Sequence, residues 1–91
     1  MRPILHGDVV AVARAILPLA SHERSRKIQD ILYTTARANA FRLSTGRAHP
    51  LWGDGSLMTA ALAENPPPEP SLDNREYCGC LAQVFEALVA R

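Results

Sequence analysis

The segment TGRAHPLWGDGS, residues 45–56, contains the only Trp of the chain, one of its three His and three of its five Gly, beside side chains that could take part in chemistry. His49, Asp54 and Ser56 are the residue types of a general base, an orienting acid and a nucleophile. Arg47 and Trp52 suit a different role, because a guanidinium, a flat indole wall and the free amides of a helix start can hold a phosphate or carboxylate. The segment therefore offers two functional hypotheses, a small anionic ligand site and a hydrolase-type site.

The same segment also has a structural interpretation, which we favour. Pro50 disfavours helical angles at His49, and Gly53-Asp54-Gly55 is typical of a turn that leads into a helix. The aspartate can accept hydrogen bonds from the next amides, so its carboxylate would occupy the donors that an anion needs and would repel that anion. GDGS also lacks the strand-turn-helix setting of a nucleophile elbow. We therefore expect a corner between two helices, with no catalytic residue, rather than an enzyme active site.

The histidines and cysteines do not show the spacing of a metal site. His6, His22 and His49 lie in three separate segments without a paired ligand. Cys78 and Cys80 are two residues apart, which on a helix turns their side chains about 200° from each other. Such a pair can neither share a metal nor form a disulfide within itself. We expect no metal and no cofactor.

A basic stripe suggests nucleic acid as a second partner class. On a predicted helix, Arg26, Lys27, Tyr33 and Arg37 project to one side, where they could contact phosphates and bases. Asp30 lies within this stripe, and the formal net charge of the chain is only +1. Strong phosphate affinity needs more charge than this, so a solvated helix back is the favoured interpretation and nucleic-acid binding the alternative.

Length and composition limit the class of protein. A chain of 91 residues of which 47% are hydrophobic predicts one small domain over residues 1–91 with a thin core. The amino terminus lacks the pattern of a secretory signal, and no apolar run reaches the roughly 18–20 residues of a membrane helix. We therefore expect a cytoplasmic protein with reduced thiols and no contact with a membrane.

Helix signals recur along the whole chain, and no alternating apolar pattern is long enough for a strand. Asp8 is a candidate N-cap for a first helix that Pro18 should end near Leu17. A longer helix follows, capped by Ser21 and ended by Gly46. A short helix of about two turns should begin after Asp54, followed by an extended proline-rich connector, ENPPPEPS, at residues 64–71. Asp73 and Glu76 resemble a capping box for the last helix, which follows the connector.

Apolar side chains at helical spacing predict where these helices pack. The second helix should bury the stripe of Ile28, Ile31, Leu32, Thr35, Ala36, Asn39 and Leu43. The last helix should bury Tyr77, Leu81, Val84, Phe85 and Leu88, with Cys80 at the rim. The predicted fold class is all-α, a small four-helix bundle-like domain with a Gly/Pro-rich central loop and a proline-rich connector before the last helix.

Three stretches carry a resemblance to a known family: RPILHGDVVA at the start, TGRAHPLWGDGSLMTAALA in the centre and YCGCLAQVFEALVA at the end. Together they resemble a family of short, uncharacterised bacterial proteins, a domain of unknown function, over most of the chain. This resemblance implies no activity, cofactor or partner.

The leading functional hypothesis comes from the aromatic side chains. A small helical domain with Tyr33, Phe41 and Trp52 at or near its surface has apolar area that a partner could cover. We therefore expect a non-catalytic protein–protein interaction module, including a homodimer.

Overall fold

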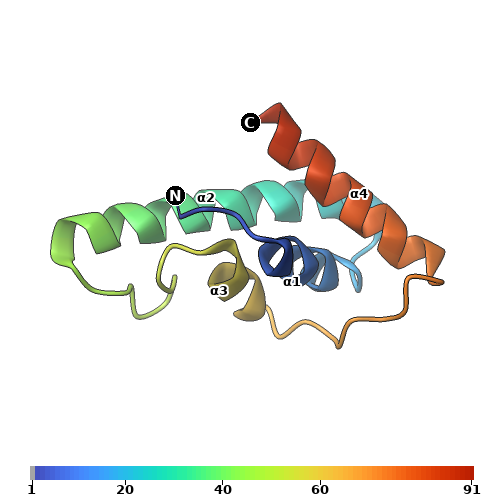
Figure 1. Cartoon of the computed structure of the whole chain (residues 1–91), viewed down its shortest axis with the longest axis horizontal. Helices are drawn as coiled ribbons and strands as arrows, with labels where there is room; N and C mark the ends of the chain where they lie inside the picture. Colours follow the sequence, from blue (N-terminus) through green and yellow to red (C-terminus); the bar gives the residue numbers. More distant parts are fainter. Residues whose placement is uncertain (1) are drawn as a thin grey trace.

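A computed structural model describes residues 2–91, which form helices joined by loops (Figure 1). The helices are α1 (His6–Ile16), α2 (Ser21–Thr45), α3 (Leu57–Leu62) and α4 (Arg75–Ala90). The principal extents of the molecule are 42 × 26 × 22 Å, and α2 runs along the longest of them. The all-α, bundle-like architecture is therefore confirmed, as are the central loop and the connector before the last helix.

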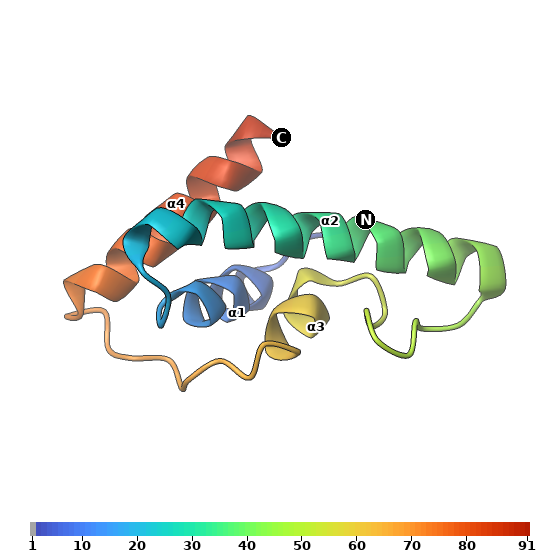
Figure 2. The same ribbon diagram turned by 180° about the vertical axis from the view of Figure 1, so that it is seen from behind.

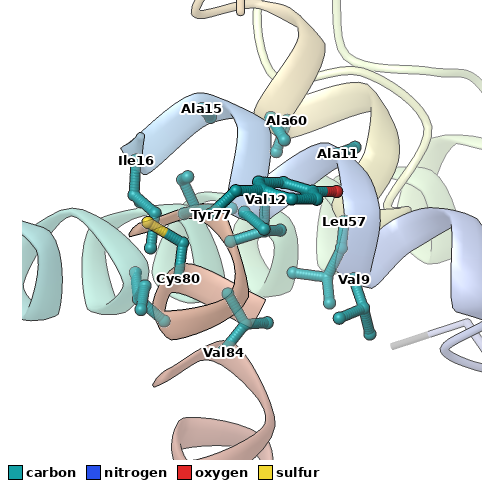
Figure 3. Close-up of a cluster of buried hydrophobic side chains, with 14 residues drawn as sticks. Val9, Ala11, Val12, Ala15, Ile16, Leu57, Ala60, Tyr77, Cys80 and Val84 are labelled. Atoms are coloured by element: carbon teal, nitrogen blue, oxygen red, sulfur yellow. The ribbon is translucent and has the colours of Figure 1, made fainter. Parts of the chain in front are cut away.

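Helix α1 lies at the centre of the packing. It contacts α2, α3 and α4, while α2 also contacts α3 and α4 (Figure 2). Small and branched side chains allow this close packing on several sides, and those of α1 that are buried include Val9, Ala11, Val12, Ala13, Ala15 and Ile16. Figure 3 shows the ring of Tyr77 from α4 lying among the side chains that α1 and α3 contribute.

The start of α1 differs from the prediction in its capping residue. The helix begins at His6 after an extended Leu5, so Asp8 stands in the first turn instead of at the N-cap. Its carboxylate accepts a hydrogen bond from the amide of Leu5 at 2.8 Å and another from the amide of Met58 at 2.9 Å. One buried carboxylate thus satisfies free amides at the starts of both α1 and α3, which fixes the two helices to each other.

Helix α2 ends as predicted, at Gly46, whose φ of +74° places it in the left-handed C-cap conformation. Its N-cap is Ala20, so the prediction of Ser21 was wrong by one residue. The buried side chains are Arg24, Ile28, Ile31, Thr35 and Ala38. The predicted core residue Leu43 is exposed because the last turns of α2 extend past α1, as Figure 1 shows. Ala36 is exposed because, at about 100° per residue, it lies roughly 120° from the centre of the buried face.

The connector before α4 contains neither helix nor strand, as predicted, and hydrogen bonds attach it to the helices. Arg14 donates from Nε to the carbonyl of Pro67 at 2.8 Å, and the hydroxyl of Tyr77 donates to Glu69 at 2.6 Å. Burial of the Tyr77 ring, together with that bond to a carboxylate, raises the pKa of its phenol well above the usual range. The N-cap of α4 is Asn74, which accepts from the amide of Tyr77 at 3.0 Å, so the predicted capping box at Asp73 was wrong by one residue.

The buried face of α4 is formed by Tyr77, Cys80 and Val84. Cys80 is fully buried at the centre of this face instead of at its rim, and burial raises the pKa of its thiol. The prediction that Phe85 is buried was wrong: it is 48% exposed, because it follows the buried Val84 and projects about 100° away from it. Cys78 and Cys80 are both free thiols, as their spacing predicted.

Candidate functional site in the loop between α2 and α3

The loop between Gly46 and Ser56 folds back on itself at its centre. His49 and Gly53 exchange two backbone hydrogen bonds, of 2.8 and 3.0 Å. The Nδ1 atom of His49 accepts from the amides of Leu51 and Trp52, both at 3.0 Å. With Nδ1 acting as an acceptor, the proton of the neutral ring is on Nε2. The imidazole therefore stabilises the turn that contains it.

Aromatic and cationic side chains stack along α2 and hold this turn against the helix. The rings of His49 and Trp52 are parallel with centroids 3.9 Å apart, and Phe41 meets His49 edge-on at 4.7 Å. The guanidinium of Arg37 lies 4.7 Å from the Trp52 ring and 5.6 Å from the ring of Tyr33, to whose hydroxyl it also donates. We call these residues the Arg37–Trp52 stack. Ring stacking and cation–π contacts of this kind stabilise a partly exposed corner.

Asp54 is the centre of a separate hydrogen-bond network at the start of α3. Its carboxylate accepts from the amide of Ser56 and from the hydroxyl of Thr59, each at 3.0 Å, and forms an ion pair of 3.0 Å with Arg2. The hydroxyls of Ser56 and Thr59 are 2.7 Å apart, and Ser56 caps α3 by accepting from the amide of Thr59. Hydrogen bonds from Ser56 are the main cause of the lowered pKa of Asp54, with smaller contributions from Thr59 and Arg2.

The hydrolase hypothesis concerned His49, Asp54 and Ser56, and their contacts show what each of them does in the fold. Within residues 2–91, no hydrogen bond joins His49 to Asp54 or to Ser56. His49 accepts from backbone amides, whereas the hydroxyl of Ser56 pairs with Thr59. Nucleophilic catalysis needs a hydrogen-bonded chain from base to nucleophile, and the geometry instead supports helix capping and turn formation.

The other predicted site residues are distributed over several surroundings. Arg47 is exposed on the loop, and the hydrogen-bond partners of Asp54 within residues 2–91 are Arg2, Ser56 and Thr59 instead. Of the basic stripe on α2, Arg26 is exposed and Lys27 forms an ion pair of 2.9 Å with Glu64. Arg37 and Tyr33 belong to the Arg37–Trp52 stack, where the cation already contacts aromatic rings. The structure thus brings together His49 with Trp52, and Asp54 with Ser56, but not all five residues of the loop hypothesis.

A comparison with protein families identifies the family of this chain. The model for the family described as Domain of unknown function (DUF7742) matches residues 2–88. The chain belongs to this family. A search of curated proteins and a search of solved structures each found no match. The resemblance stated from the sequence, to a domain of unknown function, is therefore confirmed.

Residues that the sequence did not single out contribute to the site in this DUF7742 domain. Arg2 pairs with Asp54 across 52 positions of the sequence, and Thr59 completes the network from inside α3. A depression of about 610 Å³ lies beside them, lined by Arg2, Pro3, Leu5, Gly7, Asp8, Ser56 and Met58. The spacing of Ser56 and Thr59 was a local signal for the cap, but nothing local indicated Arg2.

Two further features of the DUF7742 domain concern metal-binding clusters and helices that could cross a membrane. Residues 2–91 contain no cluster of three or more His, Cys, Asp or Glu side chains placed to hold a metal ion. In the same range, no helix combines the length and apolar character needed to cross a bilayer.

Acid should weaken the DUF7742 domain partly through Asp54. Because the folded state lowers the pKa of this carboxyl, its stabilising effect is present above the usual carboxyl pKa and is lost as the pH falls through the folded-state pKa. We expect Asp54→Asn to lower the free energy of unfolding by about 1 kcal/mol at neutral pH, and expect this difference to shrink below about pH 4. Urea unfolding at a series of pH values measures it. Asp30→Asn, which removes a carboxylate outside this network, is the control, and an Asp54→Asn difference independent of pH would contradict the assignment.

Proposed function

We propose that this DUF7742 protein is a non-catalytic module that acts by binding another protein chain. The observation that carries the proposal is a pair of large apolar side chains on one side of α4. Phe85 is 48% exposed and Val89 is 86% exposed, and their spacing of one helical turn puts them side by side. Isolated apolar residues are common on protein surfaces, whereas adjacent ones on a helix with few charges are typical of an interface.

The hydrogen bonds of the polar side chains in the loop between α2 and α3 support the same proposal. His49, Asp54 and Ser56 are engaged in hydrogen bonds that fold the loop and cap α3. Residues with these structural duties are poor candidates for binding a substrate, since a ligand would have to displace intramolecular bonds that stabilise the fold. Association through apolar area requires no such rearrangement.

The two alternatives from the sequence have less support from the geometry. For nucleic acid, Lys27 is paired with Glu64 and Arg37 is held in the Arg37–Trp52 stack. For an anionic ligand, the carboxylate of Asp54 already accepts from the amide of Ser56. Gel shifts at low salt and a thermal-shift screen of phosphates, nucleotides and carboxylates test these alternatives, and we expect no response in either.

Site-specific photo-crosslinking in the native cells tests the proposed function. A benzophenone amino acid replaces Phe85 in one variant and the exposed Gln29 of α2 in a matched control. We expect covalent adducts with a protein, either a second copy or a different chain, from position 85 at a yield several-fold above the control. Yields at position 85 no higher than those at position 29 would overturn the proposal.

A further inference from the structure

We propose that the exposed side of α4 pairs antiparallel with the same side of a second copy of this chain, an inference that rests on the proposed function. This side, which we call the outer face of α4, consists of Arg75, Cys78, Gly79, Ala82, Phe85, Glu86 and Val89. At about 100° per residue these positions share an arc of about 120°, opposite the buried Tyr77, Cys80 and Val84. The contacts of α4 with other helices go to α1 and α2, and Figure 1 shows it at the edge of the bundle.

Gly79 is the first indication that another backbone approaches this face. Glycine is among the least favourable residues inside a helix, yet this one lies in the second turn of α4. A Cβ added at Gly79 would meet nothing within 4 Å, so the packing of the single chain leaves room for a side chain at this position. Ala82, one turn later on the same face, is exposed and also small. Small residues at a helix crossing allow two axes to come closer than large side chains permit.

The charges on the outer face are the second indication. Arg75 is the first residue of α4 and Glu86 lies one turn before its end, the reverse of the arrangement that the helix dipole favours. In an antiparallel pair this disadvantage becomes an attraction. Arg75 then lies near the negative end of the partner helix and beside the partner's Glu86, and the second ion pair follows by symmetry.

A single two-fold axis pairs both the opposite charges and the small residues of the outer face of α4. The midpoint between positions 75 and 86 falls between residues 80 and 81, and the midpoint between positions 79 and 82 is the same. The register that pairs the charges therefore also places Gly79 against the partner's Ala82 at the crossing. A face whose complementary groups are related by its own two-fold axis is what an isologous dimer requires, which favours a second copy over an unrelated partner.

The same register covers the exposed apolar side chains. Phe85 then lies opposite position 76 of the partner helix, between the partner's Arg75 and the partner's Gly79, where the missing side chain of the glycine leaves room for the ring. Val89 is placed toward the partner's Leu72, which is 65% exposed in the turn just before α4. Because Phe85 and Val89 are the apolar residues that carry the proposed function, the two-fold pairing accounts for both of them.

A charge exchange tests the register on the intact chain. Sedimentation velocity from micromolar to millimolar concentration is expected to show a monomer–dimer equilibrium. Arg75→Glu or Glu86→Arg alone places like charges together at two symmetric positions, and we expect each to raise the dimer Kd about tenfold. The double variant R75E/E86R should return the Kd to within about threefold of the original, because the pairs are restored with reversed polarity. Arg26→Glu, an exposed charge change on α2, is the control.

Gly79→Ala separates the dimer from the stability of the single chain. Alanine favours the helix, so at concentrations where the chain is monomeric we expect the midpoint of thermal unfolding to rise by about 2–8 °C. The added methyl groups separate the helices at the crossing, so the dimer Kd should rise about tenfold. A variant that is more stable and yet associates more weakly cannot be explained by misfolding.

The outcomes distinguish this inference from the proposed function. A chain that stays monomeric over the whole range, or a dimer that the double variant does not restore, overturns the two-fold pairing. Crosslinks from position 85 to a different protein, in a chain that is monomeric, leave the proposed function in place and remove the pairing. Absence of both crosslinks and dimer removes both.

Discussion

Replacing Arg24 with methionine is expected to lower the free energy of unfolding by about 3 kcal/mol. Arg24 is only 9% exposed and connects three helices. From α2 it donates to the carbonyl of Ile16 at 3.1 Å and to that of Leu17 at 2.8 Å, and it forms an ion pair with Glu76 at the start of α4.

The size of the effect follows from what methionine leaves behind. The carbonyls of Ile16 and Leu17 close the last turn of α1, whose backbone acceptors have no further partners within the helix. Removing Arg24 leaves the partly buried Leu17 carbonyl without its donor, which costs about 1–3 kcal/mol. The Ile16 carbonyl loses one of its two donors and keeps the amide of Leu19, at 3.1 Å. Methionine retains most of the aliphatic volume, so the loss measured is mainly that of the hydrogen bonds.

Two companion variants make the Arg24 result specific. Arg26→Met removes an exposed guanidinium from the same helix and should change stability by less than about 0.5 kcal/mol. Glu76→Gln removes only the ion pair, whose acid side chain is 62% exposed, and should cost about 1 kcal/mol. Chemical denaturation of the three variants gives the comparison. An Arg24→Met value close to that of Arg26→Met would show that the α1 carbonyls are satisfied by water instead.

Arg24 also marks the limit of what the sequence could predict. The helix ends were set by local signals, since Pro18 cannot continue α1 and Gly46 readily adopts the left-handed cap. The contacts of Arg24 with Glu76, of Arg2 with Asp54 and of Asp8 with Met58 each join residues at least 50 positions apart. Spacing along the chain contains no information about such pairs.

The core of α2 shows the same limit. Periodicity correctly predicted that Ile28, Ile31 and Thr35 are buried, but it also extended the stripe to Leu43, which is 79% exposed. A helical repeat says which residues share a face and not how far the neighbouring elements reach. In this fold the loop, instead of a helix, packs against the end of α2, where His49 and Trp52 of the loop contact Phe41 and Arg37 of the helix. The structural interpretation of the loop came from its glycines and aspartate, whose types are local signals.

The second large effect is expected at Gly55, where alanine should lower the free energy of unfolding by about 3 kcal/mol. Its φ of +93° lies outside the region that L residues adopt readily. A Cβ at this position would be 2.9 Å from the Cα of Asn39, a backbone atom of α2 that cannot rotate away. Because the backbone of the loop approaches the backbone of α2 closely at Gly55, the substitution should push this part of the loop off the helix.

Gly46→Ala separates backbone strain from that contact. Gly46 also has a positive φ, of +74°, but an added Cβ there meets nothing within 4 Å, so this variant should lose only about 1 kcal/mol. Thermal and urea unfolding give the stabilities. The near-ultraviolet signal of Trp52 reports separately whether its stacking on His49 persists. We expect Gly55→Ala to reduce that signal and Gly46→Ala to preserve it. Equal losses in the two variants would mean that the loop does not depend on its close approach to Asn39.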